Sequence, residues 1–353
     1  MIRVAFIKYG GMGAGGTERW LQMAALALPR EKYHVTYFYS DNDIDPNRLR
    51  LMQSSALQLV QFSVKSRKKN LTHDWESTDF WEKFHESEFD LVQTAKFCTA
   101  EYPYNRINLP IVEKIAFAVG VDYSPNIIFT ITPSDWLRRK WVNKGGTFIR
   151  SGVVPVPVQE PCTTQNFRTE LGIPNKAIVA GFHQRIDDNS FSPIPLQAFA
   201  RLQKIGRHFV ILGGSKLYYK QAQALGLRNI HFIEHNSDPY LISKFLNTLD
   251  IFAHGRKDGE TYGSVFSEAL MHGLPCLSHR SSADNAQKET MGPHGLFAWG
   301  LITYWIHLFR LFKCENLRNN LSAGSRDYAK KRYGASEFQV KLTNIYEKIS
   351  ELI

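Results

Sequence analysis

The stretch Leu249-Asp-Ile-Phe-Ala-His254 runs into Gly255-Arg-Lys-Asp-Gly-Glu260 and then into Thr261-Tyr-Gly-Ser-Val-Phe-Ser-Glu-Ala-Leu-Met-His-Gly-Leu-Pro275. The first part is a short apolar run, which is typical of a buried parallel strand. The second part is polar and charged and contains glycine, so it is expected to be a loop. In the third part, apolar residues recur at helical spacing until Gly273 and Pro275 end the helix. This order predicts a strand–loop–helix unit followed by another strand.

The amino end of this predicted helix is suited to an anionic ligand. The amides of Gly263, Ser264 and Val265 have no partners within the helix, so they carry partial positive charge that favours phosphate groups. Glu268 faces the same side one turn deeper, where its carboxylate can accept hydrogen bonds from a vicinal diol such as a ribose. Glu260 precedes the helix and can reach a sugar beyond the phosphates. Spacing alone leaves a second interpretation open, because solvated glutamates are common on protein surfaces.

The two glutamates and the residues after them resemble a family signature. Glu260-x7-Glu268, followed by Ala-Leu-Met-His-Gly-Leu-Pro, is similar to the E-x7-E motif of the retaining glycosyltransferases of family 4. The resemblance implies a GT-B enzyme, in which two Rossmann-like, doubly wound parallel-sheet α/β domains face a cleft and take a sugar from a nucleotide diphosphate. It implies that Glu268 holds the ribose, that Glu260 lies beside the transferred sugar, and that the amides of residues 263–265 hold sugar and phosphates. Thr261-Tyr262 is a mild departure from the middle of the motif.

Length, charge and cysteine usage narrow the class of protein. A chain of 353 residues with 43% hydrophobic residues suits two α/β domains with buried cores. The four cysteines lack metal-ligand spacing, and the sequence has neither a signal pattern nor an apolar run of spanning length, so we expect a cytoplasmic protein. The net charge of +10 suits phosphate-bearing ligands or an acidic membrane surface. A nucleic-acid partner is not expected, because the basic residues are dispersed.

Two segments raise the question of peripheral contact with the inner face of a membrane. Lys65-Ser-Arg-Lys-Lys69 is the densest basic cluster. We expect a solvated loop there, with docking to a membrane that carries a lipid-linked acceptor as the alternative. Phe297–Phe312 is the most apolar stretch. A packed core helix is expected, and an amphipathic helix lying on a membrane is the alternative.

Strands and helices alternate along the chain, which favours two doubly wound parallel sheets. Strands are predicted at Arg3–Ile7, His34–Tyr39, Leu57–Val60, Leu91–Thr94, Pro110–Ile115, Ile127–Thr132, Ala177–Phe182, His208–Leu212, Ile230–Ile233, Asp250–Ala253 and Cys276–Ser278. Helices are predicted at Thr17–Leu28, Ser134–Lys144, Ser192–Ile205, Lys216–Leu225, Pro239–Thr248, Tyr262–His272, Leu317–Lys331 and Glu337–Leu352.

A stiff linker is predicted between the two halves. Val153-Val-Pro-Val-Pro-Val-Gln-Glu-Pro161 contains three prolines, which favour an extended chain that cannot continue a central strand. We therefore predict an N-terminal acceptor domain at residues 1–155 and a C-terminal nucleotide-sugar domain at residues 156–336. By analogy with GT-B enzymes, the last helix, at residues 337–353, is expected to pack back on the first domain.

A glycine-rich loop, Tyr9-Gly-Gly-Met-Gly-Ala-Gly-Gly-Thr-Glu-Arg19, follows the first predicted strand. Its five glycines let the backbone approach a ligand, and the helix that follows directs free amides to the same place. Gly15, Gly16 and Glu18 are similar to the G-G-x-E loop of family 4, and the resemblance implies contact with donor phosphate or acceptor. The same loop matches the G-x-G-x-x-G fingerprint of an NAD-dependent oxidoreductase, and a strand–helix turn without a ligand is a third interpretation.

The segment after the predicted strand Ala177–Phe182 occupies the place of the family pattern G-R-x4-K-G. Arg185 matches the arginine, which would clamp the donor phosphates and stabilise the leaving diphosphate. Ser190 stands at the lysine position among the donor-binding residues, and a hydroxyl cannot supply that positive charge. Lys257, in the loop before the first glutamate, is a candidate to supply it. The alternative is that Arg185 is a loop arginine paired with a neighbouring aspartate.

Members of the family often carry a histidine after a middle strand of the first domain, near the reaction centre. The corresponding regions of this chain contain none, so Glu101, Glu113 and Lys96 are candidates for part of its role. His183 and His254 follow strands of the second domain. For each, a structural role explains the residue at least as well as catalysis does.

The resemblance to family 4 implies a retaining glycosyltransferase, and we expect it to use no metal ion or cofactor, because Arg185 and helix amides would stand in for a cation. The expected donor is a UDP- or GDP-sugar and the expected acceptor a glycan or glycolipid, in polysaccharide, lipopolysaccharide or glycolipid biosynthesis. The alternatives are a nucleotide-sugar epimerase of the same fold, the NAD-dependent oxidoreductase, and a non-catalytic nucleotide-sugar binder. The last is suggested by the missing lysine and histidine.

Overall fold

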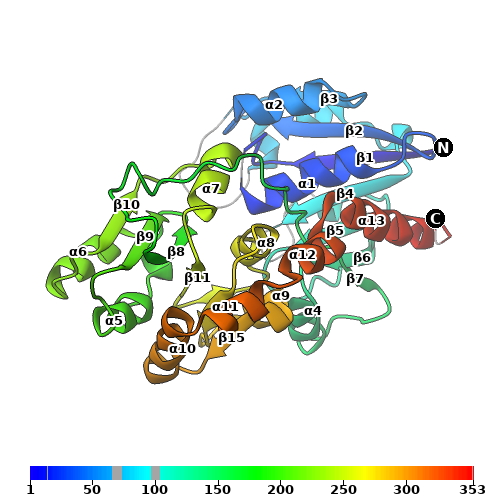
Figure 1. The fold of residues 1–353 in the computed structure, drawn as a ribbon. Helices are drawn as coiled ribbons and strands as arrows, with labels where there is room; N and C mark the ends of the chain where they lie inside the picture. Colours follow the sequence, from blue (N-terminus) through cyan, green and yellow to red (C-terminus); the bar gives the residue numbers. More distant parts are fainter. Residues whose placement is uncertain (14, 66–73, 97–103, 352) are drawn as a thin grey trace. The chain divides into compact units, whose positions relative to one another are not determined.

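The chain divides into two compact units, which Figure 1 shows as a ribbon. The structure is a computed structural model that describes residues 1–13, 15–65, 74–96, 104–351 and 353. Unit 1 comprises Met1–Pro157 and Ser336–Ile353, and unit 2 comprises Val158–Ala335. Glu101 and most of the basic cluster at 65–69 lie outside the described residues.

Unit 1 is built on a seven-stranded parallel sheet in the order β3-β2-β1-β4-β5-β6-β7. The strand order reverses direction between β1 and β4, which creates a switch point at the carboxyl ends of these two strands. Its strands are β1 (Ile2–Lys8), β2 (Tyr33–Ser40), β3 (Gln58–Phe62), β4 (Leu91–Lys96), β5 (Ile111–Ile115), β6 (Ile127–Thr132) and β7 (Ser151–Val153).

Helices cover one face of this sheet and make its main core. The Trp20 side chain of α1 (Gly16–Ala27) is fully buried, and its indole N–H donates to the Val154 carbonyl at 2.9 Å. The chain's last helix, α13 (Ala335–Ser350), packs into the same core, where the Tyr346 hydroxyl donates to Gln93 at 2.8 Å. The remaining α-helices among the described residues of the unit are α2 (Pro46–Gln53), α3 (Phe80–Lys83) and α4 (Asp135–Val142).

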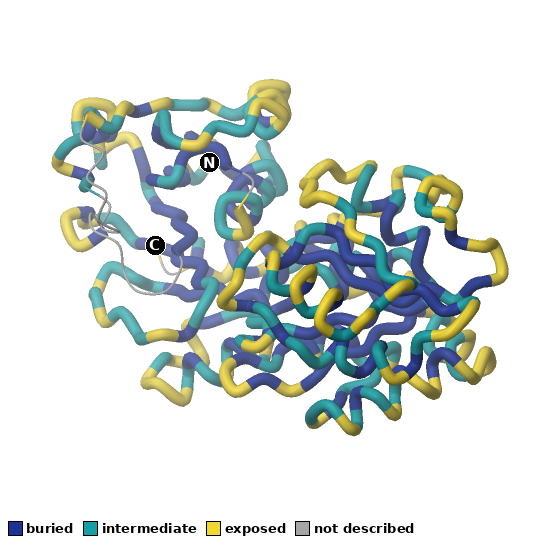
Figure 2. Tube along the Cα trace, turned by 90° about the vertical axis from the view of Figure 1, so that its left-hand side faces the viewer, coloured by how far each residue is buried: buried dark blue, intermediate teal, exposed yellow. Residues whose placement is uncertain are grey.

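Unit 2 is built on a six-stranded parallel sheet in the order β10-β9-β8-β11-β13-β15. The four central strands of this sheet are buried almost throughout and are drawn mainly in dark blue in Figure 2, whereas its two edge strands are mostly half-buried. The order reverses between β8 and β11, so the switch point lies at the carboxyl ends of these strands. The strands are β8 (Ile178–Gln184), β9 (Arg207–Gly213), β10 (Ile230–Ile233), β11 (Ile251–Ala253), β13 (Cys276–His279) and β15 (Gly295–Ala298).

The helices of unit 2 connect these strands, and a separate two-stranded ribbon lies beyond the sheet. The ribbon pairs β12 (Gly259–Glu260) with β14 (Asp284–Asn285) in parallel. The helices are α5 (Ile194–Ala200), α6 (Lys216–Ala224), α7 (Pro239–Leu246), α8 (Ser264–Met271), α9 (Gln287–Met291), α10 (Leu301–Lys313), α11 (Glu315–Ser322) and α12 (Ser325–Tyr333).

The prediction of two parallel-sheet α/β domains is confirmed, and three local predictions are wrong. Val153 belongs to β7 rather than to the linker, because three residues pair with β6 before the first proline. The packed helix expected across Phe297–Phe312 begins only at Leu301, because the first residues end a strand, and it buries Tyr304 and Leu308 but leaves Ile302 70% exposed. The helix predicted at Leu317–Lys331 is two helices, because Gly324 adopts φ +76°.

Within the described residues, no helix is both long enough and apolar enough to cross a membrane.

Candidate functional site

The candidate site of unit 2 lies at the switch point of its sheet. His183 and Arg185 stand at the carboxyl end of β8, and His254 and Arg256 follow β11, the neighbouring strand. Ligands of open α/β sheets bind at this edge because the loops from the two strands diverge there and leave a crevice. The topology therefore brings the loop that carries Glu260 next to the loop that carries Arg185.

Helix α8 begins at this edge, directly beside Glu260. Gly263 caps it in a left-handed conformation with φ +82°. A Cβ added there would lie 3.3 Å from the Glu260 Cβ and 2.8 Å from the Phe266 ring, so glycine alone suits this approach. The first amides of α8, at Ser264 and Val265, precede the helical hydrogen-bond ladder and point out of the helix end. Four predicted site residues, at 260 and 263–265, therefore lie next to one another at the amino end of α8.

Glu268 lies on the second turn of α8 and faces His183. The Glu268 Oε2 atom is 3.0 Å from the His183 Nε2 atom, and the two side chains are 16% and 10% exposed. The two atoms are in close contact without hydrogen-bond geometry, and both side chains are mostly shielded from solvent. Sequence reasoning named both residues but not their contact, which depends on the pairing of β8 with β11.

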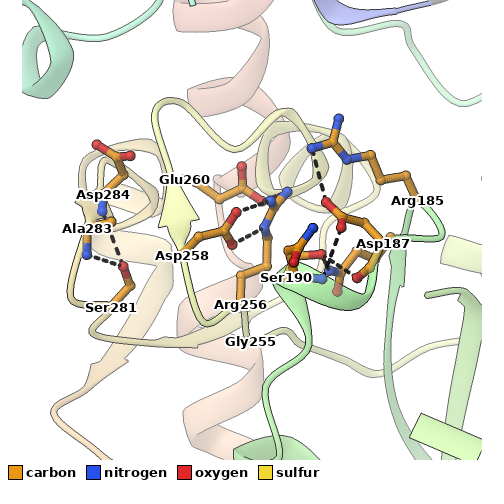
Figure 3. A network of polar contacts seen from close by, with 12 residues as sticks. Arg185, Asp187, Ser190, Gly255, Arg256, Asp258, Glu260, Ser281, Ala283 and Asp284 are labelled. Atoms are coloured by element: carbon orange, nitrogen blue, oxygen red, sulfur yellow. Dashed lines mark hydrogen bonds and ion pairs between the residues drawn. The ribbon is translucent and has the colours of Figure 1, made fainter. Parts of the chain in front are cut away.

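Arg256 is the main charged residue that the sequence did not reveal (Figure 3). Its guanidinium donates to both Asp258 carboxylate oxygens, at 2.9 and 2.6 Å, and to Glu260 Oε1 at 3.4 Å. The side chain is only 12% exposed, so these charges interact in a partly desolvated environment. The loop thus carries one buried cation shared by two carboxylates.

The charge state of Glu260 is set by burial and by this cation. Burial raises the pKa of Glu260 above its ordinary value, and the negative charge of Asp258 raises it further. The positive charges of Arg256 and Arg185 oppose the rise. Glu260 is therefore a carboxylate whose ionisation depends on nearby arginines.

The backbone of Glu260 is held from both sides by the segment after β13. Its N–H donates to Gln287 Oε1 at 3.3 Å, and its carbonyl accepts from the Ala286 N–H at 2.9 Å. Gly259, at φ +71°, lies so close to the Asp284 carbonyl that an added Cβ would be 1.7 Å from that oxygen. The short β12–β14 ribbon therefore fixes where the Glu260 side chain points.

Arg185 and Ser190 occupy different environments. The Arg185 side chain is 61% exposed and contacts Asp187 at 3.3 Å, the pairing that sequence reasoning left as an alternative. Ser190 is fully buried, and its hydroxyl accepts from Gln184 and donates to the Asp187 carbonyl. The Ser190 side chain, expected among the donor-binding residues, thus lies inside the unit. The exposed Lys257 is adjacent, because its N–H donates to the Ser190 carbonyl at 3.2 Å.

His254 has a structural environment. The side chain is 1% exposed and packs against the rings of Phe252, Phe266 and Phe182. Burial lowers the pKa of His254 well below its ordinary value, and the charge of Arg256 contributes in the same direction. A neutral core histidine is the result.

The glycine-rich loop belongs to unit 1. Glu18 folds back onto it, so that a Cβ added at Gly15 would lie 2.3 Å from Glu18 Oε2, whereas none of the described atoms lies within 4 Å of a Cβ added at Gly16. Glu18 Oε1 is 3.3 Å from the ammonium of the buried Lys8. Burial opposes ionisation of Glu18, but Lys8 and a hydrogen bond from Thr17 outweigh it and lower the pKa.

Two candidates for the role of the family histidine, Lys96 and Glu113, form a buried ion pair on the other face of the unit 1 sheet. Glu113 also accepts from the Thr130 hydroxyl at 2.9 Å, and Asp122 lies 3.7 Å from the Lys96 ammonium. Burial raises the pKa of Glu113 above its ordinary value, and the nearby Asp122 adds to the rise while Lys96 opposes it. Both charged groups of the pair are therefore engaged by partners within unit 1.

No group of three or more histidine, cysteine, aspartate or glutamate side chains in the described part of the chain is placed to hold a metal ion.

Comparison with known proteins places this site within a recognised domain. Residues 163–296 match the family model described as glycosyl transferases group 1. The matched segment contains Arg185, Arg256, Glu260 and Glu268, and it lies entirely within unit 2. A search of curated proteins gave no match.

Solved structures share the whole fold. HepE from Anabaena, crystallised with UDP and glucose, is 16% identical with a TM-score of 0.73, and the match covers 99% of this chain and 100% of HepE. WaaG, a glycosyltransferase involved in lipopolysaccharide biosynthesis, is 16% identical with a TM-score of 0.69, covering 97% and 99%. A putative UDP-N-acetylglucosamine 2-epimerase from Listeria monocytogenes is 13% identical with a TM-score of 0.62, covering 100% and 97%. The chain therefore has the GT-B fold.

Proposed function

We propose that this protein is a retaining glycosyltransferase that moves a sugar from a nucleotide diphosphate donor to an acceptor hydroxyl. The observation that carries the proposal is the arrangement at the switch point of unit 2, where Glu260 and Glu268 flank the amino end of α8. The group 1 match over residues 163–296 and the UDP complexes of HepE support a nucleotide-sugar donor. A UDP-sugar is the first donor to test, and a GDP-sugar the second.

In this proposal, unit 2 holds the donor. Glu268, which lies beside His183, accepts hydrogen bonds from the ribose hydroxyls, and the amides at Ser264 and Val265 face the diphosphate. Glu260 contacts the hydroxyls of the transferred sugar from the opposite side of the helix end. As the bond between sugar and diphosphate breaks, negative charge grows on the diphosphate, and preorganised amides and arginines stabilise it more than they stabilise the intact donor.

Arg185 and Arg256 have separate roles in this mechanism. Arg185 is exposed and can turn from Asp187 to the leaving diphosphate, because a surface ion pair costs little to exchange. Arg256 is held by Asp258 and Glu260, so it acts by positioning and ionising Glu260. Lys257 is the exposed cation nearest to the place where the family pattern has lysine. These cations support the expectation that no metal ion is required.

The acceptor class and the cellular setting are further parts of the proposal. A glycan or glycolipid acceptor in polysaccharide or lipopolysaccharide biosynthesis is consistent with the fold shared with WaaG. We place the protein in the cytoplasm, where nucleotide sugars are made. Peripheral membrane contact is supported by the outer side of α10, where Ile302, Ile306 and Phe309 are exposed beside Arg310.

Release of UDP from a UDP-sugar in the presence of an extract of cell-envelope glycans tests the proposal. We expect acceptor-dependent release, a product with the anomeric configuration of the donor, and loss of both in Glu260→Gln. Isomerised donor in the absence of acceptor would identify an epimerase. A change in nicotinamide absorbance with NAD would identify an oxidoreductase, and donor binding without any product would identify a binding protein.

A further inference from the structure

A cavity in unit 1 lies on the amino side of its sheet, away from the switch point. The volume of this cavity is about 190 Å³. Its walls come from the segment between β5 and β6, the first half of β6, the last turn of α4 and the residues just before β7. The residues that precede neighbouring parallel strands share one edge of a sheet, and α4 returns the chain to that edge. The cavity is therefore separate from the carboxyl ends of β1 and β4.

Aromatic side chains form much of this cavity. Trp141 is 4% exposed and Tyr123 is 76% exposed, so the cavity has a buried floor and an open mouth. Two glycines after α4 allow this packing. A Cβ added at Gly145 would lie 2.5 Å from the Tyr123 hydroxyl, and a Cβ added at Gly146 would lie 2.2 Å from the Trp141 ring. A cavity of about 150 Å³ accepts a benzene ring, so this one has room for a six-membered ring.

Two buried polar atoms of the cavity wall lack a hydrogen-bond partner within the described residues. They are the indole nitrogen of Trp141 and the Asp122 Oδ2 atom. The other Asp122 oxygen accepts from the Ser124 N–H at 2.9 Å, whereas Oδ2 lies 3.7 Å from the Lys96 ammonium, too far for a hydrogen bond. Buried polar groups are nearly always paired, because their desolvation is otherwise uncompensated. The cavity thus offers one donor and one acceptor to a ligand.

A hydroxyl-bearing ring matches this pair of atoms. A hydroxyl both donates and accepts, so neighbouring hydroxyls of one ring suit Asp122 and Trp141 at once. Among the described residues that line the cavity, the charged ones are Asp122 and Arg150, and their opposite charges favour a neutral ligand. Arg150 is exposed, and no described side chain pairs with its guanidinium, which is thus available to oxygen atoms of a ligand.

Water is the simplest alternative occupant of the cavity. Water would satisfy the two polar atoms but leave the faces of Tyr123 and Trp141 hydrated. A sugar ring carries hydroxyls at its rim and C–H groups on its faces, so it satisfies the same atoms and also covers the aromatic rings.

We propose that this cavity of unit 1 binds a neutral sugar ring, at a second site besides the donor site of unit 2. Asp122 accepts from one ring hydroxyl, the Trp141 indole N–H donates to another oxygen, and Tyr123 covers the ring at the mouth. The ligand is either one unit of a glycan chain or a free monosaccharide, since both present the same ring. The site is defined by unit 1 alone and does not rest on the proposed function.

Saturation-transfer NMR of the full chain with D-glucose, D-galactose and D-mannose, in the presence of saturating UDP, tests this site. We expect transfer to at least one hexose with the wild type, at least tenfold weaker binding to Asp122→Asn, and unchanged binding to Asp327→Asn. The amide of the first variant puts a donor where the carboxylate has its unpaired acceptor, whereas Asp327 is exposed on α12. Equal binding to Asp122→Asn, or no transfer to any of the three hexoses, would overturn the proposal.

The Trp141 indole N–H reports directly on the cavity. Its signal in the ¹⁵N spectrum of the tryptophan-labelled chain is the one that Trp141→Phe lacks. This signal should move on addition of the hexose, because a ligand oxygen becomes the acceptor of the indole N–H. Transfer to a hexose without movement of the Trp141 signal would place the sugar elsewhere and contradict the site.

A linear trisaccharide of the bound hexose separates the two sources of the ring. Tighter binding of the trisaccharide would identify a glycan unit, and equal binding would identify a free sugar; either result supports the site. Hexose binding that disappears when UDP is added would belong to the donor site, which overturns the proposal. Absence of UDP binding would instead refute the proposed function, and the comparison of Asp122→Asn with Asp327→Asn would remain valid.

Discussion

Glu260 and Glu268 are held in different ways, and this difference separates their roles. Glu268 lies on α8 with its carboxylate 3.0 Å from the His183 Nε2 atom. Glu260 shares an arginine with Asp258, so its ionisation is coupled to a charge network. The first arrangement suits binding of a ribose diol, and the second suits a carboxylate whose charge matters beside a reacting sugar.

Replacement of Glu268 should weaken nucleotide binding without changing the fold. Hydrogen bonds to a charged group contribute about 1.5–3 kcal/mol, so Glu268→Gln should lower the affinity for UDP about 10- to 100-fold. Calorimetric titration with UDP measures the effect. Glu315→Gln, an exposed glutamate at the start of α11, is the matched control and should bind as the wild type does. Equal affinity in both variants would remove Glu268 from the site.

Replacement of Arg256 should act on turnover through Glu260. We expect Arg256→Ala to lower kcat about 100-fold, as for loss of one preorganised electrostatic group, with a smaller change in UDP affinity. Since Arg256 lowers the pKa of Glu260, its removal should raise that pKa and move the acid limb of the kcat/KM profile to higher pH. Arg256→Lys should restore part of the charge but not the two-oxygen contact. An unshifted acid limb would contradict the coupling.

The residues that sequence reasoning found and missed differ in what fixes them. Glu260 and Glu268 could be proposed because helix periodicity and the start of α8 define their spacing. Arg256 could not, because its role depends on the path of the loop between β11 and β12. The family pattern predicts that Ser190 contacts the donor. Its hydroxyl instead accepts a hydrogen bond from Gln184 and donates one to the Asp187 carbonyl, inside a 3-10 turn. Loop conformations of this kind have no periodicity from which to read them.

At the scale of elements, the β12–β14 ribbon is what holds the first glutamate. Two residues on each side pair in parallel, and Gly259 makes the closest backbone approach in this segment. The ribbon is too short to show hydrophobic alternation, so the sequence predicts only a loop there. This pairing holds the segment around Gly259 in one conformation, so the backbone of Glu260 has a fixed position.

Gly259→Ala should destabilise unit 2 far more than a matched glycine substitution does. Gly226 has φ +60° and no atom within 4 Å of an added Cβ, so Gly226→Ala isolates the cost of the left-handed conformation, about 1 kcal/mol. Gly259→Ala adds a clash with the Asp284 carbonyl and should cost at least about 3 kcal/mol. Urea unfolding of the two variants measures the difference. Similar costs would mean that the ribbon can move apart easily.

Helices and strands with a clear hydrophobic pattern could be predicted from the sequence. Strands that exist only through pairing with a neighbouring strand could not. The first six strands of unit 1 are apolar runs bounded by turn residues, and their predicted centres agree with the structure. β7 and β15 are short strands whose pairing with β6 and β13 decides them. The break between α11 and α12 is set by the left-handed Gly324, which an otherwise continuous helical pattern hides.

At the scale of the whole molecule, the two sheets share one design. Each has a switch point beside its first strand, and at each of them charged residues and a helix amino end meet at the carboxyl edge of the sheet. The alternation of strands and helices in the sequence predicts this shared design. It does not predict that charged residues of unit 1 lie close together. Lys8 and Lys114 are far apart in sequence, and only strand register brings them to one face.

The burial of Lys114 predicts how the stability of unit 1 depends on pH. The pKa of Lys114 is about 7 in the folded protein, against an ordinary value of 10.5. Between these values the unfolded chain binds one more proton, so the unfolding free energy should rise with pH by about 1.4 kcal/mol per pH unit. Below pH 7 the full cost of charging Lys114 is present, and above pH 10.5 it is absent.

Lys114→Met should remove this dependence. The variant should be more stable than the wild type at pH 7, and the difference should shrink as pH rises to 9. Hydrogen exchange of the β1 and β5 amides, in buffers without phosphate or sulfate, follows the unfolding of this unit. Parallel stability curves for the two proteins would show that the Lys114 ammonium is solvated or paired.

The central claim is that unit 2 binds a nucleotide-sugar donor through Glu268 and the amino end of α8. Saturation-transfer NMR of the full chain against UDP-, GDP- and ADP-sugars and NAD, with Glu268→Ala beside the wild type, tests it most directly. We predict transfer to the protons of one nucleotide sugar, including its ribose, and loss of that signal in the variant. A signal from NAD alone, or an equal signal in both proteins, would contradict the claim.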